Sequence, residues 1–183
     1  MKILAIDPGN EYSAYVSYET CLTDLHDHRE KRNIKEFGKY RNSDMLSIVA
    51  STYAEYLAVE MPASYGMAVG KTIMHTCRWV GRFQDRFEHL TGRQSYLLYR
   101  KAKNEDDDIS GICMHICKNN TANDSNIRRA IIDRYPATGG GKTPQIGTKA
   151  QPGPLYGVSK DVWAALAVAI TFSETYSELK KRS

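Results

Sequence analysis

The chain has 183 residues, of which 42% are hydrophobic and 25% are charged, as in an ordinary globular domain with a sizeable core. No apolar run is long enough to span a membrane, and four scattered cysteines argue against a disulfide framework and for a reducing cytoplasm. Because the net charge of +4 is modest, the distribution of basic residues is more informative than their sum.

The first predicted element is a strand that ends in an acid. Residues 3–6 form a short apolar run of strand formers, and Asp7-Pro8-Gly9 follows. Proline and glycine end the strand, so Asp7 falls at the carboxyl end of a buried strand, where ligands gather in α/β sheets. An acid before Pro-Gly is also common in simple turns, so this motif alone leaves a purely structural role open.

The next segments predict two more strands and a helix. Residues 13–20 alternate in character and predict a second strand, antiparallel to the first because the connection is short. Residues 24–35 are expected to be mainly a solvated loop, and residues 33–40 a third strand. A helix is predicted to begin at Ser43-Asp44. Its expected apolar stripe consists of Met45, Ile48, Val49, Tyr53 and Leu57.

A fourth strand repeats the design of the first. Residues 56–60 are largely apolar and end in Glu60, and Pro62 follows. The preceding helix is a crossover that places this strand parallel to the first. If the two strands are neighbours, Asp7 and Glu60 lie side by side, where they repel each other and raise each other's pKa unless a cation neutralises them. Mg²⁺ and Mn²⁺ are the usual cations for such oxygen ligands, although Glu60 alone is also explained as a strand-end charge.

The longest predicted helix, residues 70–90, carries a row of arginines. Arg78, Arg82 and Arg86 recur every four residues and therefore share one flank. Two interpretations stay open, a solvated face partly paired with Asp85 and Glu88, or a row of phosphate contacts. The predicted apolar face consists of Ile73, Cys77, Val80, Phe87 and Leu90.

Residues 96–99 predict a fifth strand. Cys113 and Cys117 are interpreted as small core residues on a short helix, because no second Cys/His pair follows at zinc-site spacing. A further helix is predicted over residues 124–134. On that helix Ile127, Ile131 and Ile132 are expected to face inward and Arg128 and Arg129 outward.

Residues 136–157 are rich in glycine, proline and basic residues and predict a flexible loop. Gly139 to Thr143 resembles half of a phosphate-binding loop, but Pro136 stands where the pattern needs glycine. Across residues 118–151 there are six basic residues and two acids, a local net charge of +4 that suggests contact with a polyanion. The basic residues are Lys118, Arg128, Arg129, Arg134, Lys142 and Lys149.

The last predicted element is a buried helix. Ser159 is placed to cap it, and the nine residues after Asp161 are apolar all round. Asp161 is expected in the first helical turn, where an acid benefits from the helix dipole. The helix could equally deliver this carboxylate to Asp7 and Glu60.

Three motifs in order resemble one family. Asp7-Pro8-Gly9, Val59-Glu60 and Asp161 opening the alanine-rich residues 163–170 resemble the RuvC family of Holliday-junction resolvases, most closely the RuvC-like enzymes of bacteriophages. Residues 123–133 resemble the helix before that family's closing motif. The resemblance implies a single ribonuclease H-like α/β domain over residues 1–183, a five-stranded mixed sheet flanked by helices, with the first three strands antiparallel. It also implies a homodimer that nicks four-way or branched DNA in the cytoplasm of a bacterial or phage-infected cell.

The resemblance assigns roles to individual residues. Asp7, Glu60 and Asp161 would hold two Mg²⁺ ions per active site, with Mn²⁺ as a substitute, for hydrolysis that leaves 5′ phosphates. Tyr65 is the nearest substitute for the family's stacking aromatic. Ala164 stands where the family has a further ligand, so Asp161 is expected to act alone, with an acid from residues 105–108 as the alternative. DNA contacts are expected from Arg78, Arg82, Arg86, Lys118, Arg128, Arg129, Lys142, Lys149 and Lys160.

Two other classes of function stay open. The gap at Ala164 allows a module that binds branched DNA without cutting it. A phosphotransferase of the actin and sugar-kinase type also begins with a strand ending in an acid and glycine, but it needs two such domains, for which the chain is too short.

Overall fold

The computed structural model describes residues 1–20, 33–64, 66, 68–101 and 111–182. In this part of the chain the strands are β1 (Lys2–Asp7), β2 (Tyr12–Glu19), β3 (Asn33–Arg41), β4 (Tyr56–Met61) and β5 (Ser95–Tyr99). The helices are α1 (Asn42–Ser51), α2 (Lys71–Thr91), α3 (Ile112–Cys117), α4 (Asp124–Asp133) and α5 (Val162–Arg182). No helix in these residues is long and apolar enough to cross a membrane.

The strands form one five-stranded mixed sheet in the order β3-β2-β1-β4-β5. β2 pairs antiparallel with both β1 and β3, whereas β4 pairs parallel with β1 and with β5. The expected fold class, with its first three strands antiparallel, is therefore confirmed. Because β1, β3, β4 and β5 all run in one direction, their last residues meet at the same edge, which we call the carboxyl edge.

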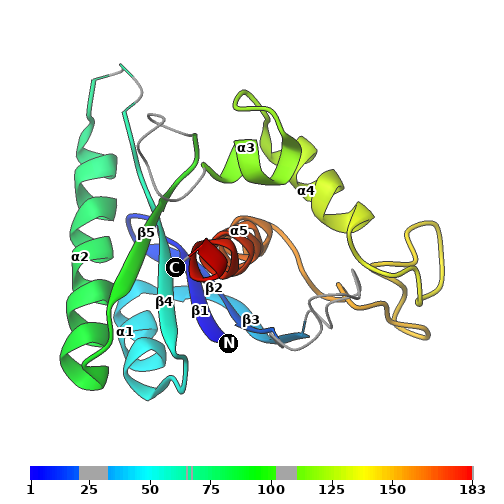
Figure 1. The fold of residues 1–183 in the computed structure, drawn as a ribbon, viewed down its shortest axis with the longest axis horizontal. Coiled ribbons are helices and arrows are strands. Elements are labelled where there is room, and N and C mark those ends of the chain that lie inside the picture. The colour runs from blue at the N-terminus through cyan, green and yellow to red at the C-terminus, as the bar shows by residue number, and fades with distance from the viewer. Residues whose placement is uncertain (21–32, 65, 67, 102–110, 183) are drawn as a thin grey trace.

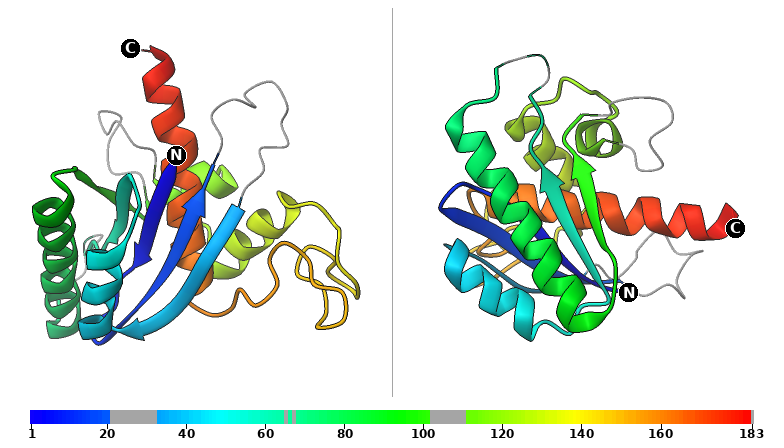
Figure 2. Two further views of the ribbon diagram at one scale, coloured as in Figure 1. Left: turned by 90° about the horizontal axis from the view of Figure 1, so that it is seen from below. Right: turned by 90° about the vertical axis from the view of Figure 1, so that its left-hand side faces the viewer.

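Helices cover both faces of the sheet (Figures 1 and 2). One face packs against α1 and α2 through Leu4, Ile6 and their neighbours. The other face packs against α5, with α3 and α4 on the outer side of α5, and this core includes Ile3 and Ala5. The alternation along β1 follows from the two-residue period of a strand, so every second residue of each strand faces α5.

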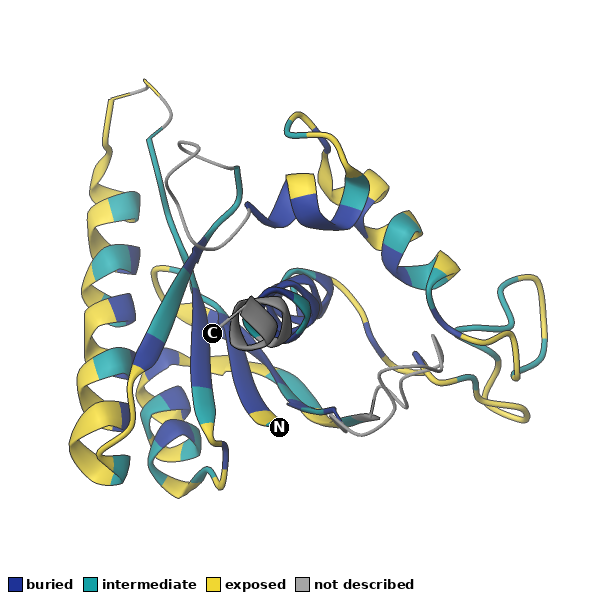
Figure 3. Ribbon diagram, in the orientation of Figure 1, coloured by how far each residue is buried: buried dark blue, intermediate teal, exposed yellow. Residues whose placement is uncertain are grey.

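The buried helix α5 is confirmed, but its start differs from the prediction. Residues 162–170 are buried except for the partly exposed Ala164, and the coloured turns of α5 in Figure 3 are mostly those of a buried helix. The carbonyl oxygen of Asp161 accepts hydrogen bonds from the N–H groups of Ala164 and Ala165 at 3.0 and 3.2 Å, so Asp161 immediately precedes the helix rather than standing in its first turn. Lys160 has a φ of 48°, and this left-handed turn removes Ser159 from the expected capping position.

Helices α1 and α2 also depart from the predicted apolar faces. α1 ends at Ser51, so Tyr53 is 90% exposed and Leu57 belongs to β4. The reason is local, because the Thr52 hydroxyl accepts a hydrogen bond from the Ala54 N–H at 3.1 Å and turns the chain. On α2 the buried side includes Phe83, and Leu90 is exposed.

The predictions for α3 and α4 hold in most respects. Cys113 is buried and Cys117 partly buried on α3, and both are free thiols. On α4, Ile127 and Ile131 are buried and Ile132 is partly buried. The side chain of Asn123 caps α4 by accepting a hydrogen bond from the Asn126 N–H at 3.0 Å.

The segment 136–157 extends beyond α4, away from the sheet (Figure 1). It folds on itself, since the Gly139 N–H donates to the Pro144 carbonyl at 2.8 Å and the Gly153 N–H to the Ile146 carbonyl at 2.9 Å. Gly147 has a φ of 78°, and a Cβ there would lie 2.2 Å from the Gly153 nitrogen, so only glycine fits this turn. The expected flexibility of the segment stays a prediction.

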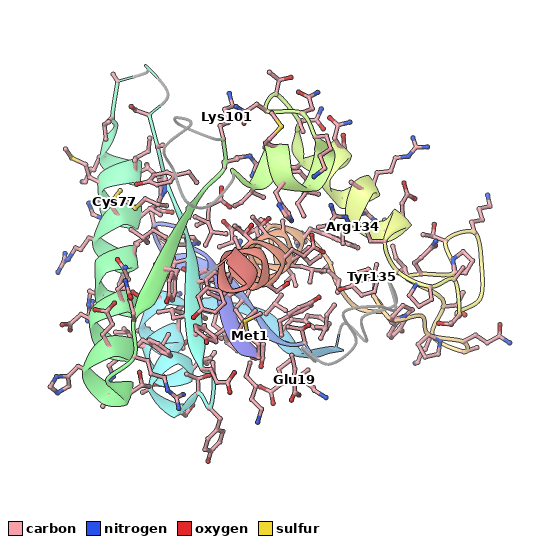
Figure 4. The ribbon with its side chains drawn as sticks, viewed as in Figure 1. Met1, Glu19, Cys77, Lys101, Arg134 and Tyr135 are labelled. Carbon is pink, nitrogen blue, oxygen red and sulfur yellow. The ribbon has the colours of Figure 1, made fainter. Side chains whose placement is uncertain are left out.

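A polar cluster joins the α3–α4 pair to α5. Arg134, which follows α4 and is labelled in Figure 4, donates from Nη1 to Glu174 Oε2 on α5 at 3.0 Å. Its Nη2 donates to the Ile116 carbonyl at 3.1 Å, and His115 Nε2 lies 2.7 Å from the same Glu174 oxygen. Glu174 is thereby held against two elements at once.

We expect Arg134→Met to destabilise the fold by about 2–3 kcal/mol, because it leaves a half-buried carboxylate with one partner fewer. Urea unfolding measures this cost. The exposed Arg129→Met on α4 is the control and should change the unfolding free energy by less than about 0.5 kcal/mol. Equal effects of the two changes would show that the cluster does not fix the α3–α4 pair.

Candidate functional site

Strand alternation brings two acids together at the carboxyl edge. In β1, Ile3 and Ala5 face α5, so Asp7 at the strand's end faces the same way. In β4, Ala58 faces α5 and Glu60 continues that side. The register pairs Ile6 with Val59, which sets Asp7 and Glu60 next to each other one residue further along.

The same alternation adds two cations to this edge. Leu98 of β5 faces α5, and Arg100 follows two residues later, directly after the strand. In β3 Phe37 packs toward α5, so Lys39 has its side chain on that face. The sheet register pairs Asp7 with Ala14 and Ala14 with Lys39, which places Lys39 two strands away from Asp7 in one row.

Two helix starts complete the site. Asp161, just before α5, and Asp124, the first residue of α4, line a cavity of about 460 Å³ together with Asp7 and Glu60. We call this cavity the acid pocket. Its other lining residues are Arg100, Ile112, Ser125, Ile127, Arg128, Lys160, Trp163, Ala164 and Ala167.

The pKa of Asp7 reflects this crowding. Burial, then the charge of Glu60, then that of Asp161 raise the pKa of Asp7 from 3.8 to about 8. Burial also raises the pKa of Glu60, an effect that Arg100 opposes and Asp124 reinforces. These acids are therefore too buried and too close together for all of them to be ionised unless a cation joins them.

Two ion pairs supply positive charge to these acids. Arg100 Nη1 lies 3.8 Å from Glu60 Oε1, and Arg100 Nη2 also pairs with Asp124. Lys39 pairs with Asp161 on the side of a neighbouring hollow of about 430 Å³, which Asp7 and Asp161 also line. Burial lowers the pKa of Arg100, but Glu60 and Asp124 raise it above its ordinary value, so the guanidinium stays charged.

The acids suit a hard divalent cation, because they offer oxygen ligands and lie near one another. All four offer oxygen ligands, as Mg²⁺ and Mn²⁺ require, and the effect of three of them on Asp7 shows their mutual proximity. Within the described residues, however, no three His, Cys, Asp or Glu side chains stand close enough together to hold one ion. Arg100 pairs with Glu60 and Asp124, and Lys39 pairs with Asp161, so a metal would have to compete with these contacts.

The structure unites some of the predicted site residues. Asp7, Glu60 and Asp161 share the acid pocket with Arg128 and Lys160. The Arg128 guanidinium lies 5.2 Å from the centre of the Trp163 ring, which supports its position on the pocket wall. Ala164 lines the same pocket without offering a ligand.

Other predicted residues lie elsewhere. Arg78, Arg82 and Arg86 are exposed on α2, on the opposite face of the sheet from α5, and Arg82 stacks 4.3 Å from the centre of the Trp79 ring. Tyr65 lies outside the described residues, as does the alternative acidic segment 105–108. The remaining predicted contacts lie outside the described lining of the acid pocket: Lys118 ends α3, Arg129 is exposed on α4, and Lys142 and Lys149 are exposed in segment 136–157.

Sequence reasoning missed Arg100, Asp124 and Lys39. Arg100 carried a usable signal, because it follows a strand parallel to β4 and the rule that located Glu60 applies to it too. Asp124 was predicted only as the first residue of a helix. Lys39 had no local signal, since its position depends on the register of β2 against β3.

The raised pKa of Asp7 predicts a pH-dependent stability when metal is chelated. A carboxyl whose pKa is 3.8 in the unfolded chain and about 8 in the fold stabilises the fold fully below pH 3.8, and this contribution is lost as pH rises through about 8. The Asp7→Asn variant has no carboxyl at this position, so it does not lose stability in this way as pH rises. Between pH 5 and pH 8 in EDTA, we expect the variant to gain on the order of 3–4 kcal/mol relative to the wild type by urea unfolding. The control is Asp85→Asn, exposed on α2, whose unfolding free energy should change with pH as that of the wild type does. If Asp7→Asn also follows the wild-type pH profile, the buried environment assigned to Asp7 is contradicted.

The solved structures that resemble this fold include two of RuvC. The structure of Thermus thermophilus RuvC aligns with a TM-score of 0.64 over 98% of this chain and 97% of its own, at 13% sequence identity. T. thermophilus RuvC in complex with a Holliday junction substrate aligns with a TM-score of 0.62 over 98% and 96%, at 12% identity. No protein-family profile and no curated protein matches the sequence. At this identity the likeness establishes the fold, which is the ribonuclease H-like fold of RuvC.

Proposed function

We propose that the chain is a structure-selective DNA endonuclease, a crossover-junction endodeoxyribonuclease that hydrolyses phosphodiester bonds in four-way or branched DNA with the help of a divalent metal. The observation that carries this proposal is the acid pocket, which Asp7, Glu60, Asp124 and Asp161 line together, and in which burial and the charges of the other three acids raise the pKa of Asp7 to about 8. The shared fold supports it, because one of the similar RuvC structures is in complex with a Holliday junction substrate. The domain would span residues 1–183.

The residues suggest the following division of labour. Asp7, Glu60 and Asp161 would hold Mg²⁺, or Mn²⁺ as a substitute, with two ions per site. When bound, metal would supply a water of lowered pKa and stabilisation of the leaving 3′ oxygen, chemistry that would leave a 5′ phosphate on the product. Asp7 must lose its proton for metal to bind, and Arg128 and Lys160 on the pocket wall attract the phosphate of the DNA.

Asp124 is the best candidate for the carboxylate that Ala164 lacks. Both residues line the acid pocket, and Asp124 reaches it from the first turn of α4. Its interaction with Asp7 contributes to the raised pKa of Asp7. We therefore propose a set of four acids, in which α4 replaces the ligand missing from α5.

The partner surfaces are further parts of this proposal. Paired nicks in opposed strands need two active sites, so a C2 homodimer is expected, with the exposed apolar side chains Met74 and Leu90 of α2 as a candidate contact.

Arg78, Arg82 and Arg86 on that helix keep two interpretations, a solvated row or phosphate contacts. Lys118, Arg129, Lys142 and Lys149 lie beyond the acid pocket, where they could follow a DNA arm. The expected closeness to bacteriophage enzymes stays a prediction, because the two RuvC structures compared above come from Thermus thermophilus.

A DNA-binding module that does not cut is the competing function. The ion pairs of Arg100 and Lys39 favour it, because they neutralise the acids without metal. Metal-dependent nicking of a synthetic junction separates the two functions.

Removal of one ligand should abolish cleavage and spare binding. We expect Asp7→Asn and Glu60→Gln each to reduce junction nicking by roughly a thousandfold or more, since the developing charge on the phosphate loses its stabilisation. Junction affinity should stay within about threefold of wild type or tighten, because a negative charge near DNA is removed. The control is the exposed Asp85→Asn, which should nick normally. Near-normal nicking by either ligand variant at saturating Mg²⁺ would rule out this site.

The role of Asp124 is tested within its own helix. Asp124→Asn should reduce metal-dependent nicking by about tenfold or more, whereas Asp133→Asn at the far end of α4 should leave it unchanged. Single-turnover cleavage across a Mg²⁺ titration measures both, and excess Mg²⁺ should partly restore the Asp124 variant. If Asp124→Asn matches Asp133→Asn while Asp161→Asn is inactive, Asp161 supplies the closing carboxylate alone.

A further inference from the structure

We propose that Arg100 is a resident cation of the acid pocket, which neutralises Glu60 and Asp124 in the metal-free protein and moves onto a DNA phosphate when metal binds. This inference rests on the proposed nuclease function and adds a form of regulation to it. Metal and junction would then bind cooperatively, because each favours the release of Arg100 from the acids.

The position of Arg100 is fixed by the sheet. It directly follows β5, and its side chain lies on the α5 side, as does that of Leu98. From there one guanidinium reaches acids on two different elements, Glu60 at the end of β4 and Asp124 at the start of α4. A guanidinium is well suited to this bridge, since its N–H groups form a planar fork.

The two ends of the bridge differ in strength. The side chain of Glu60 is 13% exposed and that of Arg100 is 30% exposed, so solvent screens this pair only in part. The side chain of Asp124 is 88% exposed, so water competes with that contact. The contact with Glu60 therefore holds the guanidinium in the pocket, and the solvent-exposed contact with Asp124 is the one that breaks more easily.

A divalent ion and this guanidinium compete for the same acid. Metal held by Asp7 and Glu60 would lie beside Arg100 and repel it, since both are cations. Metal binding to the free protein must therefore break the Arg100–Glu60 contact, which weakens the affinity for metal. A phosphate that enters the pocket gives the released fork a new partner, because phosphate oxygens accept its N–H bonds in pairs.

Linkage makes this competition reciprocal. If junction DNA strengthens metal binding by some factor, metal must strengthen junction binding by the same factor. Lys39 stands in the corresponding place for Asp161, but both side chains of that pair are about half exposed, at 44% and 46%. Solvent screening makes the Lys39 pair weaker, so Lys39→Gln should act in the same direction as a change at Arg100 and by less.

The first experiment measures Mg²⁺ binding by isothermal titration calorimetry in the absence of DNA. We expect Arg100→Gln to bind Mg²⁺ about fivefold more tightly than the wild type, since a competing cation has been removed. Arg93→Gln is the matched control, because Arg93 lies just before β5 and donates to the Ala54 carbonyl, away from the pocket. It should bind Mg²⁺ as the wild type does.

The second experiment follows Arg100 onto the DNA. Junction affinity is measured against salt concentration in EDTA and in Ca²⁺, with a check that the junction stays uncut. For the wild type, Ca²⁺ should steepen the dependence of log affinity on log salt by about one, the signature of one added phosphate contact. Arg100→Gln should lack this increment, and Arg93→Gln should keep it.

Clear outcomes would overturn the inference. Mg²⁺ binding by Arg100→Gln that is equal to or weaker than that of the wild type would show that Arg100 supports the ligands rather than competing with metal. If this variant does not fold, Arg100→Met replaces it. Methionine removes the charge and keeps a long side chain, so Mg²⁺ should again bind about fivefold more tightly than to the wild type, and unchanged or weaker binding is again decisive against the proposal. A wild type that nicks junctions while Arg100→Gln has unchanged metal affinity refutes this inference alone, whereas a wild type that never nicks refutes the proposed function.

Discussion

Electrostatic repulsion at the carboxyl edge is the constraint around which the molecule is arranged. Asp7 ends β1, Glu60 is the last residue but one of the parallel neighbour β4, and helix starts add Asp161 and Asp124. Such a group is stable only if cations join it or a carboxyl keeps its proton, and burial together with the charges of Glu60 and Asp161 raises the pKa of Asp7 to about 8. The buried helix α5 packs against the face of the sheet that carries Asp7 and Glu60, and the Arg134 cluster joins α5 to the α3–α4 pair.

Local rules were enough to find the strand-borne half of the site. Asp7 and Glu60 each end an apolar run and precede a proline by one or two residues, so strand period and proline chemistry place them at one edge without knowledge of tertiary contacts. The buried α5 followed equally from its apolar sequence. The mixed topology needed more than periodicity, and came from the family resemblance that the fold comparison supports.

Features set by tertiary register could not be read from local sequence. Lys39 reaches Asp161 only because β2 pairs with β3 in one particular register. Asp161 precedes α5 rather than opening it because Lys160 adopts a left-handed backbone conformation, which the sequence does not encode locally. When α2 packs against the sheet, Phe83 is buried and Leu90 is exposed. This differs from the predicted apolar face by a small rotation of the helix about its axis, which the spacing of apolar residues alone does not determine.

The most direct test incubates the wild-type protein with a synthetic four-way junction whose strands are labelled one at a time, and with a linear duplex of matching sequence. With Mg²⁺ we predict paired nicks in opposed strands of the junction, ends that a ligase can reseal because they carry 5′ phosphates, and an intact duplex. EDTA should abolish the nicks and leave the junction bound. A junction that is bound yet uncut with Mg²⁺, Mn²⁺ and every other divalent metal tried would contradict the assignment of the acid pocket as a nuclease site.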